Sequence, residues 1–153
     1  MEQAAEVLVV DASVAVKWHL LDEEHAQEAA LLLRRFMQGE IDLVAPTHLR
    51  YEVPSAIIVA TLGRDPRLTA QQGREAIEDF LALGLRTVNT DTLILAAYPL
   101  VHQYGIAFYD ALYLALSQQL DLPFITADGK LYQRLSQLPS VIWIGDYAGE
   151  TGR

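Results

Sequence analysis

The stretch Val7-Leu8-Val9-Val10-Asp11 decides the fold class, because it places four apolar residues directly before a carboxylate. Three of the four are β-branched, which favours a strand, and the uninterrupted apolar run is typical of a strand covered on both faces. Strands of this kind form parallel sheets with helices packed on either side. An acidic residue at the carboxyl end of such a strand lies where open α/β sheets bind their ligands.

Four further short apolar runs alternate with helical patterns along the chain. The expected strands are 41–45, 85–88, 124–126 and 141–144, and the expected helices are a short one up to 20, then 22–38, 47–62, 69–84, 90–104, 108–120 and 129–135. Asp22 is expected to cap the second helix, and Pro54 to kink or break the third near Val53. Thr69 and Gln72 have the spacing of a capping box. The alternation predicts an α/β fold with a mostly parallel five-stranded sheet and helices on both faces.

Composition narrows the class of protein further. The 153 residues fit one domain, assigned to 1–147, with a polar tail at 148–153 inside a segment expected to fray from Gly145 onward. The chain has no cysteine, which excludes a disulfide scaffold and a thiolate metal site. With 11 Lys and Arg against 20 Asp and Glu, the net charge of -9 argues against a broad basic face that grips duplex DNA. No export signal or membrane span is visible, so a cytoplasmic protein is expected.

Four acidic side chains are the candidate functional residues. Asp11 and Asp128 follow the first and fourth strands, whereas Glu52 and Asp110 lie on helices that follow strands. Each has a simpler interpretation, since either strand-end aspartate could merely cap a helix and a glutamate is usually solvated. Taken together, the four form an oxygen-only set that suits Mg²⁺ or Mn²⁺. Without a cation, like charges packed so closely would repel one another.

Four segments resemble the signature segments of the PIN-domain ribonucleases, most closely those of the VapC-type toxins of toxin–antitoxin pairs. These segments are Val9–Val14, Tyr51–Val53, Tyr109–Ala115 and Ile125–Leu131. The resemblance extends from about Val7 to Gly145. It implies a three-layer α/β/α sandwich and Mg²⁺- or Mn²⁺-dependent endonucleolytic cleavage of RNA by metal-activated water. It also implies a homodimer and a cognate antitoxin as protein partners.

Carried over onto this chain, the catalytic and metal-binding acids are Asp11, Glu52, Asp110 and Asp128. The hydroxyl positions of the family correspond to Ser13 and Thr126, which would orient metal or water. In one respect this chain departs from the pattern. Many members carry asparagine three residues after the glutamate, where this chain has Ser55 preceded by Pro54.

Three rival functions follow from the same residues. A phosphatase of the haloacid dehalogenase type needs a second aspartate at the position of Ser13, and a receiver domain needs adjacent acids after the first strand; this chain has neither. A non-catalytic PIN module that binds RNA or protein is the remaining alternative. Such a module is expected to lack one or more of the four acids, and all four are present here.

The remaining polar and aromatic residues give weaker indications. The histidines have no metal-ligand spacing and are interpreted as surface or packing residues: His19, His25, His48 and His102. Three aromatic residues are interpreted as core or interface rather than base-stacking residues: Trp18, Tyr109 and Tyr113. Several basic residues could hold RNA phosphates or equally be solvated, namely Lys17, Arg50, Arg64, Arg67, Lys130 and Arg134.

Overall fold

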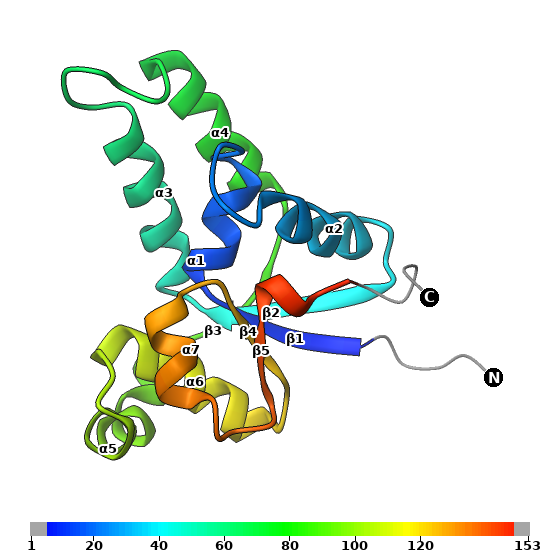
Figure 1. Ribbon diagram of the computed structural model, residues 1–153, viewed down its shortest axis with the longest axis vertical. Helices are drawn as coiled ribbons and strands as arrows, with labels where there is room; N and C mark the ends of the chain where they lie inside the picture. The colour runs from blue at the N-terminus through cyan, green and yellow to red at the C-terminus, as the bar shows by residue number, and fades with distance from the viewer. Residues whose placement is uncertain (1–5, 149–153) are drawn as a thin grey trace.

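The computed structural model describes residues 6–148 and places one sheet between two layers of helices (Figure 1). All strand pairs are parallel, in the order β3-β2-β1-β4-β5. The strands are β1 (Glu6–Val10), β2 (Ile41–Pro46), β3 (Arg86–Val88), β4 (Phe124–Thr126) and β5 (Val141–Trp143). The predicted α/β/α sandwich with a five-stranded sheet is thus confirmed. Residues 149–153 of the predicted tail lie outside the described residues.

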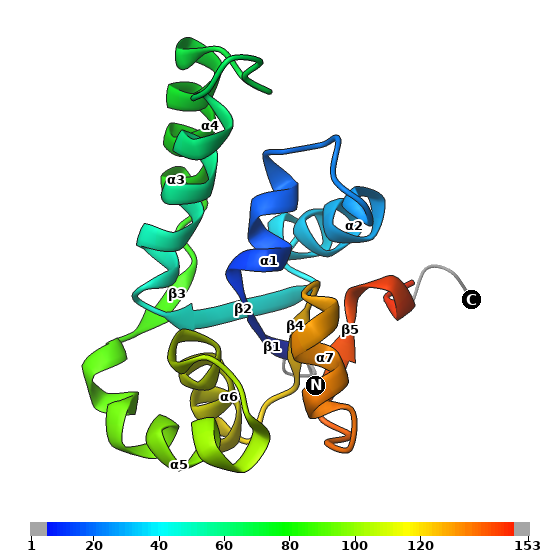
Figure 2. The ribbon, with the colours of Figure 1, turned by 60° about the vertical axis from the view of Figure 1, so that its left-hand side comes forward.

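The helices divide between the two faces of the sheet (Figure 2). One side holds α1 (Ala12–Ala15), α2 (Ala26–Met37), α3 (Leu49–Ala60) and α4 (Ala70–Ala82). The other side holds α5 (Ile94–Tyr104), α6 (Phe108–Leu120) and α7 (Gly129–Leu135). Three short 3₁₀ turns complete the structure, namely Val16–Trp18, Thr90–Leu93 and Ile144–Asp146.

The core lies on both faces of the central strand. Val9 and Val10 of β1 are fully buried, as their uninterrupted apolar run predicts. Helix α6 packs against β1, β2 and β4, and its residues from Ala111 to Ser117 are all buried. A helix that is apolar nearly all round is expected inside a protein, and α6 confirms this.

One expectation about helices is wrong, and a second is wrong in allowing a break. Asp22 does not cap α2, which begins at Ala26 after His25 in a left-handed conformation with φ of 63°. The Asp22 carboxylate instead accepts hydrogen bonds from Arg67, a residue 45 positions along the chain. Pro54 does not break α3, which runs unbroken from Leu49 to Ala60. A proline in the second turn removes only the hydrogen bond to the Arg50 carbonyl, and the burial of apolar residues along α3 outweighs that loss.

The segment after β5 is also better ordered than its polarity predicts. Tyr147 is 9% exposed, and Arg35 of α2 donates a hydrogen bond of 2.5 Å to its hydroxyl group. The expectation that the chain frays from Gly145 is therefore wrong for residues 145–147, because an aromatic side chain packs against the core and anchors them.

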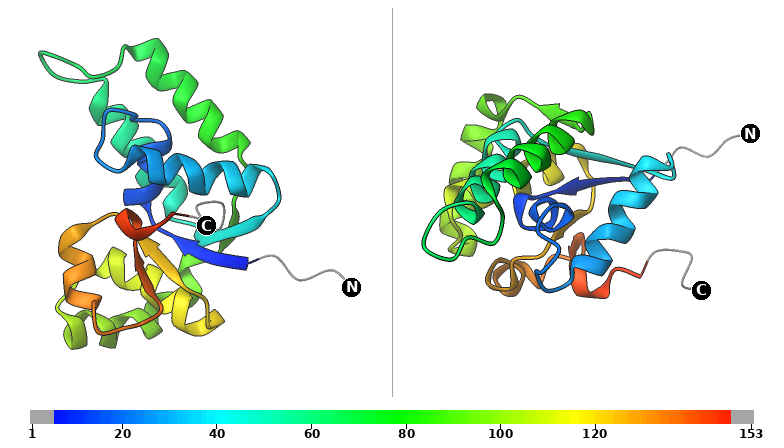
Figure 3. Two further views of the ribbon diagram at one scale, coloured as in Figure 1. Left: turned by 45° about the vertical axis from the view of Figure 1, so that its right-hand side comes forward. Right: turned by 90° about the horizontal axis from the view of Figure 1, so that it is seen from above.

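Helices α3 and α4 form a hairpin that extends away from the sheet (Figure 3, left). The predicted capping box at the start of α4 is present. Gln72 N–H donates to Thr69 Oγ1 at 3.0 Å, and Thr69 N–H donates to Gln72 Oε1 at 2.9 Å. None of the helices in residues 6–148 is long and apolar enough to cross a membrane.

We expect Thr69→Ala to lower the melting temperature of the protein by about 2–4 °C, because loss of an N-cap costs about 1 kcal/mol. Thermal unfolding followed by circular dichroism measures the change. Thr69→Ser keeps the acceptor oxygen and is the matched control. If serine and alanine destabilise equally, the methyl group rather than the cap carries the effect.

Candidate functional site

The site lies where the order of the strands reverses. From β1 the chain proceeds to β2 and β3 on one side, and then returns to place β4 and β5 on the other. The carboxyl ends of β1 and β4 therefore lie side by side at a topological switch point, where open α/β sheets bind ligands. Asp11 directly follows β1, and Asp128 follows β4 after one alanine.

Two hydroxyl groups hold the Asp11 carboxylate in place. Ser13 Oγ donates to Asp11 Oδ1 at 2.5 Å, and Thr126 Oγ1 donates to Asp11 Oδ2 at 2.6 Å. The Val14 amide also donates to Oδ1 at 3.2 Å, so Asp11 does cap α1. These three bonds use three of the roughly four acceptor positions of a carboxylate. One acceptor position of a side chain that is only 3% exposed thus remains for a ligand.

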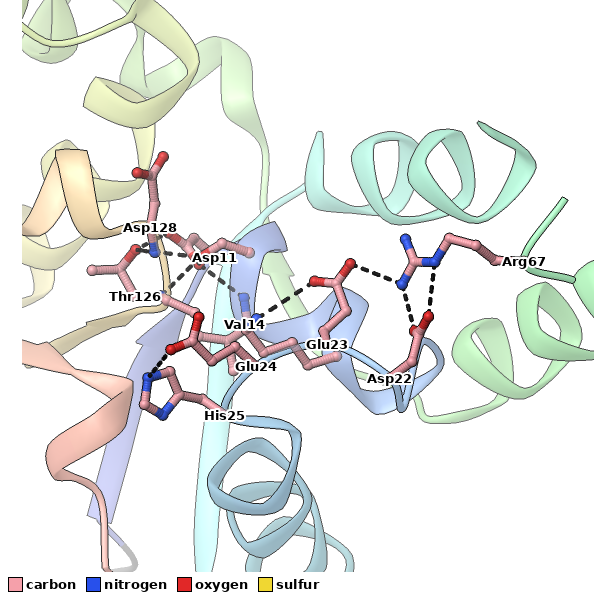
Figure 4. Close-up of polar contacts among 12 residues, drawn as sticks. Asp11, Val14, Asp22, Glu23, Glu24, His25, Arg67, Thr126 and Asp128 are labelled. Atoms are coloured by element: carbon pink, nitrogen blue, oxygen red, sulfur yellow. Dashed lines mark hydrogen bonds and ion pairs between the residues drawn. The ribbon is translucent and has the colours of Figure 1, made fainter. Parts of the chain in front are cut away.

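The same hydroxyl groups tie the ends of β1 and β4 together. Ser13 Oγ accepts from the Ala127 amide at 2.8 Å, and Thr126 Oγ1 accepts from the Asp128 amide at 3.1 Å. Figure 4 shows the backbone of Asp128 facing Thr126 while its carboxylate points the other way. Asp128 Oδ1 also caps α7, accepting from the amides of Lys130 and Leu131 at 3.0 and 3.1 Å. The helix-cap interpretation of both strand-end acids is therefore correct, and it leaves Asp128 Oδ2 without a partner among the described residues.

Glu52 reaches the site from the first turn of α3. The hydroxyl group of Tyr113, on α6, donates a hydrogen bond of 2.6 Å to Glu52 Oε1. His48 Nε2 lies 3.3 Å from the same oxygen, while His48 Nδ1 lies 3.1 Å from Thr90 Oγ1. Glu52 is therefore a positioned, half-buried carboxylate and not a freely solvated one.

Burial and repulsion change the acidity of these groups. Burial raises the pKa of Asp11 to about 7, although its hydrogen bonds from Ser13 and Thr126 oppose the rise. Burial also raises the pKa of Asp110, to about 6, and the charges of Asp128 and Glu52 add to the effect. For Glu52 burial acts in the same direction, but the contacts with His48 and Tyr113 outweigh it and lower the pKa. The charges of Asp128 and Glu52 act on Asp110, so the three side chains lie in one region.

An open pocket of about 410 Å³ connects parts of this region. Its lining includes Ser13, Glu52 and Asp128, together with Lys17 and Glu23. Lys17 is 7% exposed, and its ammonium group lies 3.5 Å from Glu23. Glu23 in turn pairs with Arg67, as Figure 4 shows. A buried cation and a chain of ion pairs thus border the acidic side chains.

The candidate ligands have the chemistry that a divalent metal requires, but their present positions do not form a metal site. All candidate ligands are carboxylate oxygens, which Mg²⁺ and Mn²⁺ prefer, and two of them have raised pKa values that a cation would offset. No three His, Asp or Glu side chains within residues 6–148 are already arranged to hold a metal ion. Convergence of Asp11, Glu52, Asp110 and Asp128 on one metal centre therefore stays a prediction.

Sequence reasoning missed three neighbours of the acids. His48 is a packing residue and Tyr113 a core residue, as expected, but both also contact Glu52, which was not predicted. The spacing of four residues between His48 and Glu52, at the start of a helix, is a signal that could have identified the histidine. Tyr113 had no such signal, because only the fold brings its side chain to Glu52, 61 positions earlier in the chain. Lys17, left open between phosphate binding and solvation, is buried beside the cleft.

Comparison with known proteins gives a consistent family likeness. A family model described as PIN domain matches residues 8–135. The chain is 32% identical over 127 residues to ribonuclease VapC12 of Mycobacterium tuberculosis, covering 83% of this chain and 91% of that protein. Ribonuclease VapC1 of the same organism is 33% identical over 104 residues, covering 67% of this chain and 74% of that protein.

Solved structures match the fold at lower identity. The toxin VapC20 of Mycobacterium tuberculosis superposes with a TM-score of 0.61 at 14% identity, covering 82% of this chain and 93% of that one. A toxin–antitoxin complex from Klebsiella pneumoniae gives a TM-score of 0.59 at 18% identity, covering 91% and 96%. At these identities the likeness shows the fold alone.

We expect Asp110→Asn to raise the melting temperature of the metal-free protein at pH 8. A carboxyl group whose pKa is raised on folding binds more protons when folded, so its contribution to stability falls as pH rises from about 4 through 6. Removing the charge should gain about 1–2 kcal/mol at pH 8, after allowance for solvent screening of a partly exposed group, which corresponds to several degrees. The gain should be roughly halved at pH 5.

Thermal melts in chelator at pH 8 and pH 5 measure this difference. Asp65→Asn, in the exposed loop between α3 and α4, is the matched control and should leave the melting temperature unchanged at both pH values. A melting temperature of Asp110→Asn below that of the wild-type protein at pH 8 would show that the carboxylate is stabilised by the fold and not strained by it.

Proposed function

The chain belongs to the PIN domain family, and on that basis we propose that it is a metal-dependent endoribonuclease. The observation that supports this most is the buried Asp11 carboxylate at the switch point, whose pKa is raised to about 7 and whose position is fixed by two hydroxyl groups. Perturbed carboxylates at ligand-binding sheet edges are typical of catalytic sites. The proposed domain is 1–147.

The proposed reaction is hydrolysis of an RNA phosphodiester bond. A water oxygen forms a bond to phosphorus, one ester oxygen leaves with a proton, and no covalent enzyme intermediate is needed. Mg²⁺ or Mn²⁺ would supply activation of the water and stabilisation of the leaving oxygen. The proposed ligands are the carboxylates of Asp11, Glu52, Asp110 and Asp128.

The surrounding residues position these carboxylates. Ser13 and Thr126 fix the Asp11 carboxylate, and Thr126 also fixes the Asp128 backbone. Tyr113 holds one oxygen of Glu52 and leaves the other free to turn towards a metal. The buried ammonium group of Lys17 lines the same pocket, where it would attract a phosphate of the RNA.

The activity is tested with purified protein and single-stranded RNA. We expect cleavage with Mg²⁺ or Mn²⁺ and none in chelator. Asp110→Asn should keep the fold and lower kcat by orders of magnitude, because a metal ligand supports the chemical step. Asp65→Asn is again the matched control and should cleave at the wild-type rate. Failure of the wild-type protein to cleave RNA in any of these metals would favour the non-catalytic RNA- or protein-binding module.

Metal binding is measured separately by thermal melts. A ligand at 100 times its Kd stabilises a folded protein by about 2.7 kcal/mol, so Mg²⁺ or Mn²⁺ should raise the melting temperature of the wild-type protein. Asp11→Asn and Asp128→Asn should gain less. Equal metal-induced shifts in the wild type and both variants would show that these two residues only cap helices.

We also propose two protein partners. Apolar side chains are exposed on the α3–α4 hairpin at Ile58, Val59 and Leu62, and on α5 at Leu95 and Tyr98. Contiguous exposed apolar side chains mark protein interfaces. An antitoxin is proposed to cover the hairpin, and a second copy of this chain is proposed to cover α5.

These partners make a joint prediction. The protein should have twice its chain mass of 17.0 kDa by light scattering, and Leu95→Glu should convert it to a monomer. Val59→Glu should leave the dimer intact but prevent co-purification with the product of an adjacent small gene. A wild-type protein that is monomeric at micromolar concentration would contradict the dimer, and co-purification of Val59→Glu would contradict the docking of an antitoxin on the hairpin.

A further inference from the structure

A second pocket adjoins the acidic cleft. Its volume is about 440 Å³, and it is lined by His48, Tyr51, Glu52, Ser55, Ala56 and Tyr109. The two pockets share Glu52 and Ala56, so they are neighbours on either side of the glutamate. A volume of this size lies within the range of small-ligand sites.

The mouth of this pocket is aromatic. The side chain of Tyr51 is 77% exposed on α3, and that of Tyr109 is 59% exposed on α6. The Tyr109 ring lies against the His48 ring, with centroids 5.6 Å apart and an angle of 40° between the planes. Exposed tyrosine rings that are positioned by the fold offer flat faces on which a planar ligand can stack.

His48, which lines the pocket, has a buried ring nitrogen without a hydrogen-bond partner among the described residues. His48 is 7% exposed, and its Nε2 atom has no hydrogen-bond partner among residues 6–148. Nε2 lies 3.3 Å from Glu52 Oε1, but the geometry is not that of a hydrogen bond. Because this nitrogen is shielded from solvent, the polar side chains of the pocket that can bond the edge of a ligand include Glu52 and Ser55.

These features favour one class of ligand. A free phosphate would meet the negative charge of Glu52, whereas an uncharged heteroaromatic ring would stack on tyrosine and accept or donate a hydrogen bond at its edge. Nucleobases are such rings, and single-stranded RNA is recognised by stacking on aromatic side chains. Resting on the proposed ribonuclease function, we propose that this pocket binds a nucleobase of the RNA, next to the phosphate that is cleaved.

Tyr109 is exposed beside the site. The sequence suggested a core or interface residue, whereas the structure leaves most of its side chain accessible beside the site. The pocket shares Glu52 with the acidic cleft, so a base stacked on Tyr109 would bring its own phosphate towards that cleft. We therefore infer that Tyr109 positions the substrate and takes no part in the chemical step.

The test uses an RNA oligonucleotide that the wild-type protein cleaves once. A series of the same oligonucleotide is made with one abasic nucleotide at each position around the cleaved bond. Wild-type protein should lose about tenfold in kcat/KM at one abasic position, as expected for one base–aromatic stack. On intact RNA, Tyr109→Ala should lose a similar factor in kcat/KM. On the RNA that is abasic at the sensitive position, this variant should lose no more than that, because the ring and the base form one interaction.

Matched variants separate stacking from other roles. Tyr109→Phe keeps the ring and should retain wild-type kcat/KM, whereas Tyr51→Ala should lose less than Tyr109→Ala because its ring is more exposed. Met37→Ala, at an exposed position on α2 outside the pocket and both proposed interfaces, should leave the abasic profile unchanged. The inference is overturned if Tyr109→Ala cleaves intact RNA like the wild type, or if the losses from the abasic position and Tyr109→Ala multiply.

Two other outcomes would point to a different cause of failure, either in the proposed ribonuclease function or in the role of Tyr109. If the wild-type protein cleaves no RNA with metal present, the proposed function fails and the base pocket fails with it. If Tyr109→Ala alters the mass of the protein in light scattering, the tyrosine belongs to an interface between protein chains and the nucleobase assignment is wrong.

Discussion

Everything at the site depends on a carboxylate buried at the end of the central strand. Asp11 is 3% exposed, and an ionised group so deep in a protein is costly unless donors surround it. Ser13, Thr126 and the Val14 amide supply those donors. The hydroxyl groups of Ser13 and Thr126 also bond to the backbone after β4. The donors that the Asp11 charge requires therefore fix the position of the end of β1 relative to the end of β4.

Burial and mutual repulsion of the ionised carboxylates lower the stability of the folded protein. Burial raises the pKa of Asp11 and Asp110, and repulsion by Asp128 and Glu52 adds to the rise at Asp110. At Glu52 the contacts with His48 and Tyr113 outweigh burial and lower the pKa. This group of acids supports the proposal that the site binds a cation, because a positive charge would offset the repulsion at neutral pH.

Much of this architecture was predictable because local patterns agree with the global fold. The apolar run before Asp11, the all-round apolar helix α6 and the capping box at Thr69 each act within a few residues. What could not be predicted depends on distant partners. Asp22 has the chemistry of a helix cap, but Arg67 binds it from the far end of the α3–α4 hairpin. Tyr113 of α6 reaches Glu52 of α3 only after both helices have packed on the sheet.

The hydrogen bond between Asp11 and Thr126 also has a consequence for synthesis. It joins residues 115 positions apart, so the loop that it closes spans most of the chain. Contacts of such long range form slowly, since the entropy of closing the loop must be overcome first. A chain emerging from the ribosome can complete β1 and β2 early, but it cannot assemble the acidic centre until β4 has been made. Premature termination anywhere before that strand yields a polypeptide without the site.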